Sequence, residues 1–309
     1  MTKLVSIVLP AYNESANIPV IAGRIQDVFK TLNYKYEMIF VNDGSRDNSQ
    51  DVLVELHNSN PNINYIELSR NFGHQNALKA GLDMANGDCV ISMDCDLQHP
   101  PELIVEFLAK WEEGYEVVYS LRQESKDLSQ FKRKTSNLFY ALINRMSEIH
   151  IEPGSADFRL LDRKVATVFS SLSENEPFIR GLIKWLGFKQ YAITYDPAKR
   201  FAGESNYTVK KMFRFAMQGL TSFSIRPLYS AIYLGFIFSF LSLSYIPYVV
   251  YSLWVHKEVQ GWASMLMTIV FFGGIQLIIL GIIGIYIGKL FIQSKQRPNY
   301  IISNSSITK

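Results

Sequence analysis

Two aspartates separated by one residue are the clearest chemical signal in this sequence. Asp94 and Asp96 follow a short apolar run at residues 90–93, and Gln98 adds a side-chain oxygen two residues later. Neighbouring carboxylates repel each other unless a cation lies between them, and oxygen ligands favour Mg²⁺ or Mn²⁺. Alternation along an extended chain would point both carboxylates to the same side. The motif therefore predicts a divalent metal site that binds a diphosphate.

Polar residues also follow two earlier apolar runs. Tyr12, Asn13 and Glu14 come after residues 4–9, and Asp43-Gly44-Ser45 comes after residues 36–41. In open α/β sheets, ligands bind at the carboxyl ends of the strands. An Asp-x-Asp pair by itself is common in surface loops, so the prediction of a site depends on this combination.

Short apolar runs alternate with amphipathic segments along residues 1–120. We expect strands at 4–9, 36–41, 63–68, 89–93 and 117–120, and helices at 16–32, 49–58, 75–85 and 101–112. Short strands between helices are typical of a mostly parallel sheet that is covered on both faces. The predicted fold class is therefore α/β, with a Rossmann-like sheet.

Two long uncharged stretches follow in the last third of the chain. Residues 227–255 and 259–288 contain no Asp, Glu, Lys or Arg, and each exceeds the roughly 20 apolar residues that cross a bilayer. They predict two transmembrane helices at about 229–254 and 262–288. Lys and Arg flank this region on both sides, and residues 4–9 are too short for a signal peptide. We therefore expect a multi-pass protein of the cell membrane with both ends in the cytoplasm.

The predicted organisation has three parts. Residues 1–225 form a cytoplasmic domain, residues 226–290 form the membrane part, and residues 291–309 form a cytoplasmic tail, in which 303–309 are expected to be disordered. Amphipathic helices at about 128–147 and 206–224 suit the membrane interface, although both could instead pack on the sheet.

Glycine motifs, net charge and cysteine content indicate which kinds of partner and compartment suit this chain. Gly273-Gly274 and Gly284-x-x-x-Gly288 permit close approach of helices, which favours a homo-oligomer. With 31 basic and 28 acidic residues, the net charge of +3 is too balanced to predict nucleic-acid binding. The two cysteines, Cys89 and Cys95, make no disulfide framework and suit a reducing compartment.

Five motifs follow one another along the chain: Val8–Glu14, Val41–Ser45, Ser69–Gly73, Met93–Gln98 and Asp157–Arg159. Together and in this order they resemble the family-2 glycosyltransferases of the GT-A fold. With two predicted spans, the chain is similar to the polyprenyl-phosphate glycosyltransferases, a group that includes bactoprenol glucosyltransferases and resembles dolichol-phosphate mannose synthase. The resemblance covers nearly the whole chain. It implies inverting transfer of a sugar from a nucleotide donor to a lipid phosphate.

The resemblance also implies roles for single residues. The implied nucleotide-binding residues are Pro10, Tyr12, Glu14, Asp43 and Asp94, and the implied metal ligands are Asp96 and Gln98, with Asp94 in the metal shell. Asp94, Asp96 and Asp157 are the implied catalytic residues, and Asp157 is either a base or a group that orients the acceptor or Arg159. His99 stands where relatives often have Asp, and we expect a turn residue there.

The acceptor can also be considered from its chemistry. A phosphate monoester, with a second pKa of about 6, is already anionic at neutral pH, so its site needs cations more than a base. Arginine matches phosphate oxygens, although each candidate could instead be a solvated surface charge. The predicted acceptor-phosphate residues are Arg122, Arg133, Arg200 and Ser205; residues 200–205 resemble the family's acceptor loop, with Asn206 where relatives usually have Lys.

The predicted reaction is transfer of glucose or N-acetylglucosamine from a UDP-sugar to undecaprenyl or another polyprenyl phosphate on the cytoplasmic leaflet. The alternatives are a polyprenyl-phosphate mannosyltransferase that uses GDP-mannose, and a non-catalytic membrane scaffold that binds nucleotide sugars. A processive polysaccharide synthase is disfavoured, because the chain has no Gln-x-x-Arg-Trp motif and only two predicted spans.

Overall fold

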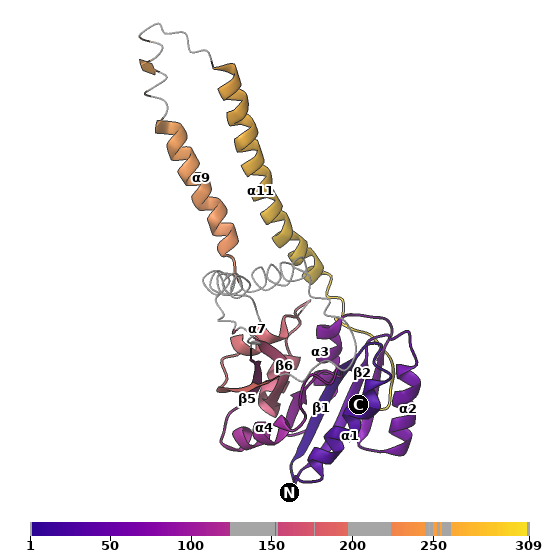
Figure 1. Ribbon diagram of the computed structural model, residues 1–309. Helices are drawn as coiled ribbons and strands as arrows, with labels where there is room; N and C mark the ends of the chain where they lie inside the picture. Colours follow the sequence, from indigo (N-terminus) through magenta and orange to yellow (C-terminus); the bar gives the residue numbers. More distant parts are fainter. Residues whose placement is uncertain are drawn as a thin grey trace. The chain divides into compact units, whose positions relative to one another are not determined.

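The chain forms two compact units in a computed structural model (Figure 1). The structure describes residues 2–123, 154–175, 177–196, 224–244 and 261–307, with a few single positions between them. The first unit contains a sheet domain together with residues 297–307. The second contains helices α9 (Arg226–Ser244) and α11 (Trp262–Ser294).

The first unit is built on one eight-stranded sheet in the order β7-β5-β6-β4-β1-β2-β3-β8. The strands are β1 (Leu4–Ala11), β2 (Lys35–Asn42), β3 (Ile63–Leu68), β4 (Cys89–Ser92), β5 (Val117–Arg122), β6 (Ser155–Asp162), β7 (Gln190–Tyr195) and β8 (Ile302–Ser305). Strands β4, β1, β2 and β3 are parallel, whereas β6 and β8 run antiparallel to their neighbours. The prediction of a mostly parallel α/β sheet is confirmed.

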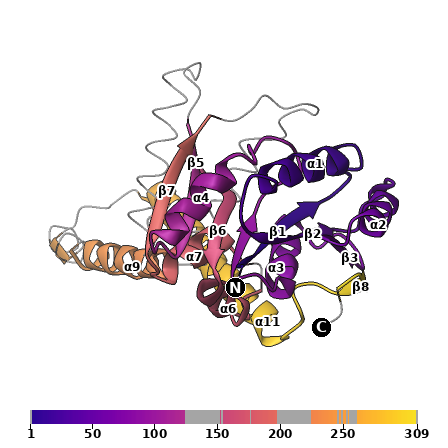
Figure 2. The ribbon, with the colours of Figure 1, turned by 90° about the horizontal axis from the view of Figure 1, so that it is seen from below.

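Helices cover both faces of this sheet (Figure 2). They are α1 (Asn17–Phe29), α2 (Ser49–Ser59), α3 (His74–Met84), α4 (Leu103–Glu112), α6 (Arg163–Ser170) and α7 (Ile179–Trp185). The buried apolar residues of α1 and α4 pack with Val5, Ile7 and Leu9 of β1. Since neighbouring side chains of a strand point to opposite faces, Val8 lies on the other face, where α3 packs. Because β1, β2 and β4 are parallel, their carboxyl ends meet at the same edge of the sheet.

Residues 303–305 are ordered, so the expected disorder of the tail is wrong there. They belong to β8, which pairs antiparallel with β3 through Ile66↔Ser305 and Glu67↔Asn304, and Ser306 N donates to Tyr65 O at 3.0 Å. A polar composition does not reveal that an open sheet edge elsewhere offers backbone partners. The outer edge of β3 offers those partners here.

Within the described part of the chain, one helix is long and apolar enough to cross a membrane. It comprises Met267–Ser294 of α11, with a mean hydropathy of 2.4 and no burial in its most apolar window. Helix α9 supplies a shorter apolar stretch, Ala231–Leu241, and its Phe238 ring lies 5.2 Å from that of Phe272. A second span therefore stays a prediction. The expected amphipathic helices at 128–147 and 206–224 lie outside the described residues, apart from Ser224.

Candidate active site

The loops after β1 and β2 are joined by hydrogen bonds. Asn13 N donates to Ser45 Oγ at 2.9 Å, and Arg46 N donates to Asn13 Oδ1 at 2.9 Å. Asn13 has a φ of 57°, in the left-handed region that Asn tolerates better than most residues. Beside it, the Tyr12 side chain is 42% exposed and available to a ligand. Pro10 is a buried residue of β1, and Glu14 N donates to Ser49 Oγ at 3.1 Å.

Asp43 lies buried after β2 and holds the next loop. Its carboxylate accepts hydrogen bonds from Phe72 N at 2.7 Å and from Gly73 N at 3.0 Å. Burial raises the pKa of Asp43, and these two hydrogen bonds oppose that increase. A Cβ at Gly44 would overlap the backbone of Arg70 and Asn71, so this contact between loops requires glycine. Asp43 retains lone pairs for a ligand.

The acidic loop after β4 is bent. Strand β4 ends at Ser92, residues 95–97 form a bend, and Leu97 has a φ of 60°. Asp96 Oδ1 accepts a hydrogen bond from Gln98 N at 3.1 Å. The bend, and not the alternation of an extended strand, therefore places the two carboxylates of Asp94 and Asp96. Burial raises the pKa of Glu14, the hydrogen bond from Asn17 opposes that increase, and the charges of Asp96, Asp47 and Asp94 add to it. Glu14 therefore lies in the same region as Asp94 and Asp96.

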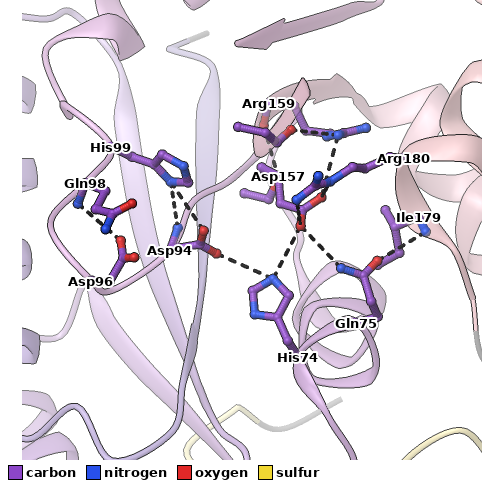
Figure 3. Close-up of polar contacts among 12 residues, drawn as sticks. His74, Gln75, Asp94, Asp96, Gln98, His99, Asp157, Arg159, Ile179 and Arg180 are labelled. Atoms are coloured by element: carbon purple, nitrogen blue, oxygen red, sulfur yellow. Dashed lines mark hydrogen bonds and ion pairs between the residues drawn. The ribbon is translucent and has the colours of Figure 1, made fainter. Parts of the chain in front are cut away.

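Two histidines lie beside Asp94 (Figure 3). His74 Nε2 lies 3.4 Å from Asp94 Oδ1, and Asp94 N donates to His99 Nδ1 at 3.2 Å. The ring of His99 is 5% exposed and stacks on Phe158 with centroids 5.2 Å apart. His99 lies in the bend before Pro100 as expected, but its buried side chain also supports the acidic loop.

Asp157 lies on β6 and is the centre of an ion-pair network (Figure 3). Arg180 of α7 binds both its oxygens, with Nε 2.7 Å from Oδ1 and Nη2 2.8 Å from Oδ2. Arg159 Nη2 lies 3.6 Å from Oδ1. Gln75 Nε2 donates to Oδ2 at 3.3 Å, while Gln75 Oε1 accepts from Ile179 N at 3.2 Å. The network joins β6 to the amino ends of α3 and α7.

His74 connects this network to the acidic loop. Its Nε2 lies 3.5 Å from Asp157 Oδ2 as well as close to Asp94. Burial lowers the pKa of His74, but the carboxylates of Asp94 and Asp157 outweigh that effect and raise it to about 9. His74 is therefore an imidazolium at neutral pH and bridges a carboxylate of the acidic loop and one of β6.

The electrostatics of Asp157 favour the ionised form. Burial would raise its pKa, but the charge and hydrogen bonds of Arg180, with smaller effects of His74 and Arg159, hold the pKa of Asp157 well below its usual range. A carboxylate with such a low pKa accepts a proton poorly. This environment suits a group that orients its neighbours.

Arg122 lies near the same region. It is the exposed last residue of β5, and its backbone N donates to Gly154 O at 2.9 Å. Burial raises the pKa of Tyr195, its partner on β7, to about 12, and the charges of Arg122, Asp94 and Asp96 also act on that hydroxyl. Arg133, Arg200 and Ser205 lie outside the described residues.

Sequence reasoning missed His74, Gln75 and Arg180. His74 and Gln75 directly follow the Ser69–Gly73 motif, and that position was the available signal. No sequence motif marks Arg180. Its role depends on the contact between α7 and β6, and both elements are distant from the acidic loop along the chain.

Comparison with known proteins identifies the family of this chain. Residues 6–169 match the family model described as Glycosyl transferase family 2. The uncharacterized glycosyltransferase YkcC of Bacillus subtilis (strain 168) is 44% identical over 97% of this chain and 93% of its own length. The bactoprenol glucosyl transferase of Shigella phage SfV is 38% identical over 97% of this chain and 98% of its own length.

Among solved structures, S. aureus TarS 1-349 in complex with UDP-GlcNAc is 18% identical, over 72% of this chain and 66% of that chain, with a TM-score of 0.47. This likeness is too weak to bear on function. The full-length relatives and the family match together define a glycosyltransferase. The chain belongs to glycosyl transferase family 2.

Proposed function

We propose that this glycosyltransferase moves a sugar from a UDP-sugar to a polyprenyl phosphate, undecaprenyl phosphate being the expected form, at the cytoplasmic face of the cell membrane. The observation that carries the proposal is the identity over nearly the full length to proteins named bactoprenol glucosyl transferase, 38% and 36% for those of Shigella phages SfV and SfX. That match includes the region of α11, which is apolar enough to anchor the enzyme beside a lipid. Glucose or N-acetylglucosamine is the proposed sugar.

The donor half of the proposed site is formed by the loops after β1, β2 and β4. The exposed ring of Tyr12 is available to stack on the base, and Asp43 lies at the adjacent loop. The proposed nucleotide-binding residues are Pro10, Tyr12, Glu14, Asp43 and Asp94. The hydrogen bonds between the loops after β1 and β2 support a preformed site, because they fix these two loops before a ligand arrives.

The acidic loop fits a divalent cation. Asp94 Oδ1 is buried and accepts no hydrogen bond from the described residues; its one charged neighbour among them is His74 Nε2, at 3.4 Å. In that part of the chain, no three His, Cys, Asp or Glu side chains gather closely enough to hold an ion by themselves. Mg²⁺ is commonly bound by one or two carboxylates together with substrate phosphates. Asp94, Asp96 and Gln98 would hold Mg²⁺ or Mn²⁺ together with the donor diphosphate, and the ion would supply positive charge to stabilise the leaving group.

In the proposed reaction, the phosphate group of the acceptor is the nucleophile that attacks the sugar. A phosphate oxygen forms the new bond to the anomeric carbon with inversion, the bond from that carbon to the diphosphate breaks, and UDP leaves with the electron pair. A phosphate anion needs no proton removed, which agrees with the low pKa of Asp157 and supports an orienting role for that residue. Arg122, Arg133, Arg200 and Ser205 are proposed to bind the acceptor phosphate.

The proposed enzyme is a multi-pass membrane protein with its catalytic domain in the cytoplasm, and it forms a homo-oligomer. Gly273, Gly284 and Gly288 of α11 support the oligomer, because nothing in the described part of one chain lies within 4 Å of a Cβ built at these positions. That leaves room for the helix of a second copy.

The test is transfer of label into lipid. Membranes that contain the protein are incubated with a panel of labelled UDP- and GDP-sugars, undecaprenyl phosphate and Mg²⁺, and are then extracted with organic solvent. We expect label in the organic phase from one UDP-sugar, and its loss with chelator or with Asp96→Ala. Asp27→Ala, which removes a surface acid of α1 paired with Lys30, is the control and should leave transfer unchanged. Absence of lipid-linked label from every donor would contradict the proposal.

A further inference from the structure

One segment of the chain, residues 69–84, supplies several groups to the candidate site. Its loop donates the Phe72 and Gly73 amides to Asp43. Helix α3 then places His74 3.4 Å from Asp94 and Gln75 within hydrogen-bond distance of Asp157. The position of this segment therefore affects the three acidic residues that the resemblance assigns to the nucleotide, the metal and the acceptor.

Residues 299–306, which we call the strap, hold the segment near both of its ends. Ser69 N, just before the loop, donates to Ile301 O at 2.9 Å. Tyr300 OH donates to Asp83 Oδ2 at 2.9 Å in the last turn of α3. Asn299 Nδ2 donates to Glu174 O at 2.8 Å, after α6. The rest of the strap is β8, which lies beside β3 at the edge of the sheet (Figure 2).

The bond from Tyr300 is made to a fixed carboxylate. Asp83 Oδ1 lies 3.2 Å from Lys79 Nζ, and the Lys79 side chain is 8% exposed. Lys79 Nζ also donates to Ser170 O at 3.4 Å. A buried ammonium keeps its carboxylate partner because an unpaired buried charge is costly. Burial and the nearby Asp83 raise the pKa of Tyr300, so its hydroxyl stays protonated and remains a donor.

Helix α3 can transmit this restraint to the site. It contains 11 residues, which correspond to a length of about 16 Å. Near its carboxyl end, a Cβ at Gly81 would collide with Val8, so the helix rests directly on the sheet there. A rigid helix that is held at Asp83 and supported at Gly81 has a defined direction. That direction determines where His74 and Gln75 lie at the other end.

We propose that the strap positions the donor half of the site, with Tyr300 and Ile301 as positioning residues. Tyr300 acts through Asp83 and α3, and Ile301 acts through the backbone of Ser69 and the loop that binds Asp43. The proposal rests on the proposed function for the identity of the ligand. Its geometric part, restraint of residues 69–84 by the strap, stands without it.

The first experiment compares two substitutions that each remove one tyrosine hydroxyl from a carboxylate. Tyr300→Phe removes the bond to Asp83, and the control Tyr34→Phe removes the 2.8 Å bond to Glu112 at a distant surface. With Tyr300→Phe we expect the KM for the nucleotide sugar to rise about three- to tenfold, the range for loss of one hydrogen bond. The KM for the polyprenyl phosphate should stay within about twofold, because Arg180 and Arg159 hold Asp157 independently of α3. Tyr34→Phe should change neither KM.

The second experiment is hydrogen exchange of the full-length protein in detergent without substrate. In Tyr300→Phe, peptides covering residues 69–84 should exchange about three- to tenfold faster, and Tyr34→Phe should leave them unchanged. Unchanged exchange, or equal increases in both KM values, overturns the proposal. If the unsubstituted protein transfers no sugar, the proposed function is wrong, and the exchange comparison still decides the role of the strap.

Discussion

The carboxylate of Asp157 is held by more charged and polar side chains than any other described group in the site. Two arginines, one histidine and one glutamine surround a carboxylate that is 3% exposed. Such a group is stable only while its partners remain, because an unpaired buried charge costs several kcal/mol. The bidentate bond from Arg180 is the shortest of these contacts and offers the clearest test at the scale of one residue.

Replacement of Arg180 by Gln should lower both stability and activity. Asp157 loses two charge-assisted hydrogen bonds, so we expect a loss of about 2 kcal/mol in unfolding free energy. The misplaced carboxylate should slow transfer about 100-fold. Thermal unfolding and transfer assays measure the two effects. The control Arg24→Gln breaks an exposed 3.0 Å pair with Glu102 and should cost less than about 1 kcal/mol. Equal losses in both variants would contradict this role of Arg180.

His74 predicts a dependence of stability on pH. Its pKa is raised to about 9 in the folded protein, above the unfolded value of about 6.5. The stabilisation is therefore complete below about pH 6.5 and is lost as the pH rises through 9. In EDTA, the melting temperature of the unsubstituted protein should fall between pH 6.5 and 9.5. The fall should be smaller in His74→Gln and retained in the control His57→Gln. Identical profiles in all three proteins would argue against a charged His74.

At this scale the sequence predicts which residues can bind a cation, but not which residues support them. Asp94, Asp96 and Gln98 stand together in the sequence and also lie together in one loop. His74 and Arg180 come from α3 and α7, and they meet Asp157 only because the sheet order places β6 beside β4. Spacing along the chain cannot show such a contact.

At the scale of elements, α3 lies against the sheet more closely than its sequence suggests. Gly81 is the position that permits this approach, because a Cβ there would overlap a methyl of Val8 and come within 3.1 Å of Val41 Cγ2. Glycine is otherwise unfavourable inside a helix by about 1 kcal/mol relative to alanine. Close packing of α3 on β1 therefore outweighs helix propensity at this position.

Two glycine-to-alanine substitutions should consequently have opposite effects. Gly81→Ala should destabilise the protein by about 1–3 kcal/mol, because the added methyl overpacks the contact between α3 and β1. Gly23→Ala in α1, where nothing lies within 4 Å of the added Cβ, should stabilise it by about 0.5–1 kcal/mol. Thermal unfolding of both variants measures the difference. Stabilisation by Gly81→Ala would show that the helix sits further from the sheet.

The strands and helices of the first 120 residues were predicted well because their hydrophobic periods are clear. Residues 63–68, for example, form β3 with the bounds expected from the sequence. Strands β6 and β7 were not predicted, and neither was β8. Pairing at a sheet edge depends on the free backbone groups of β3, which no feature of the Ile302–Ser305 sequence reveals.

At the scale of the whole molecule, the second unit differs from the first because it exposes many large apolar side chains. Large apolar side chains of α11, such as Leu277 and Ile278, are 71% and 65% exposed. Such a surface is typical of a protein that contacts lipid or other helices. The sequence predicts this region by its lack of charge. The first predicted span, at about 229–254, stays a prediction, since the described residues of this range include only the shorter apolar stretch Ala231–Leu241 of α9.

A charge in the middle of α11 should disrupt membrane insertion. Ile278→Lys should disfavour insertion by about 2.5–3.5 kcal/mol, since a lysine at the centre of a span must leave water. Val20→Lys, on an exposed position of α1, is the control and should have no effect. Fractionation of carbonate-washed membranes measures the outcome. Full retention of Ile278→Lys in the membrane fraction would count against α11 as a span.

The pairing of β8 with β3 also affects how the chain is made. A ribosome completes β3 long before β8, and at about 5–20 residues per second the interval is roughly 10–50 seconds. During that time α11 is synthesised while the outer edge of β3 stays unpaired, and unpaired edges recruit other chains. A chain that stops inside α11 would keep that edge open permanently. Completion of the sheet thus depends on completed synthesis of the helix that precedes its last strand.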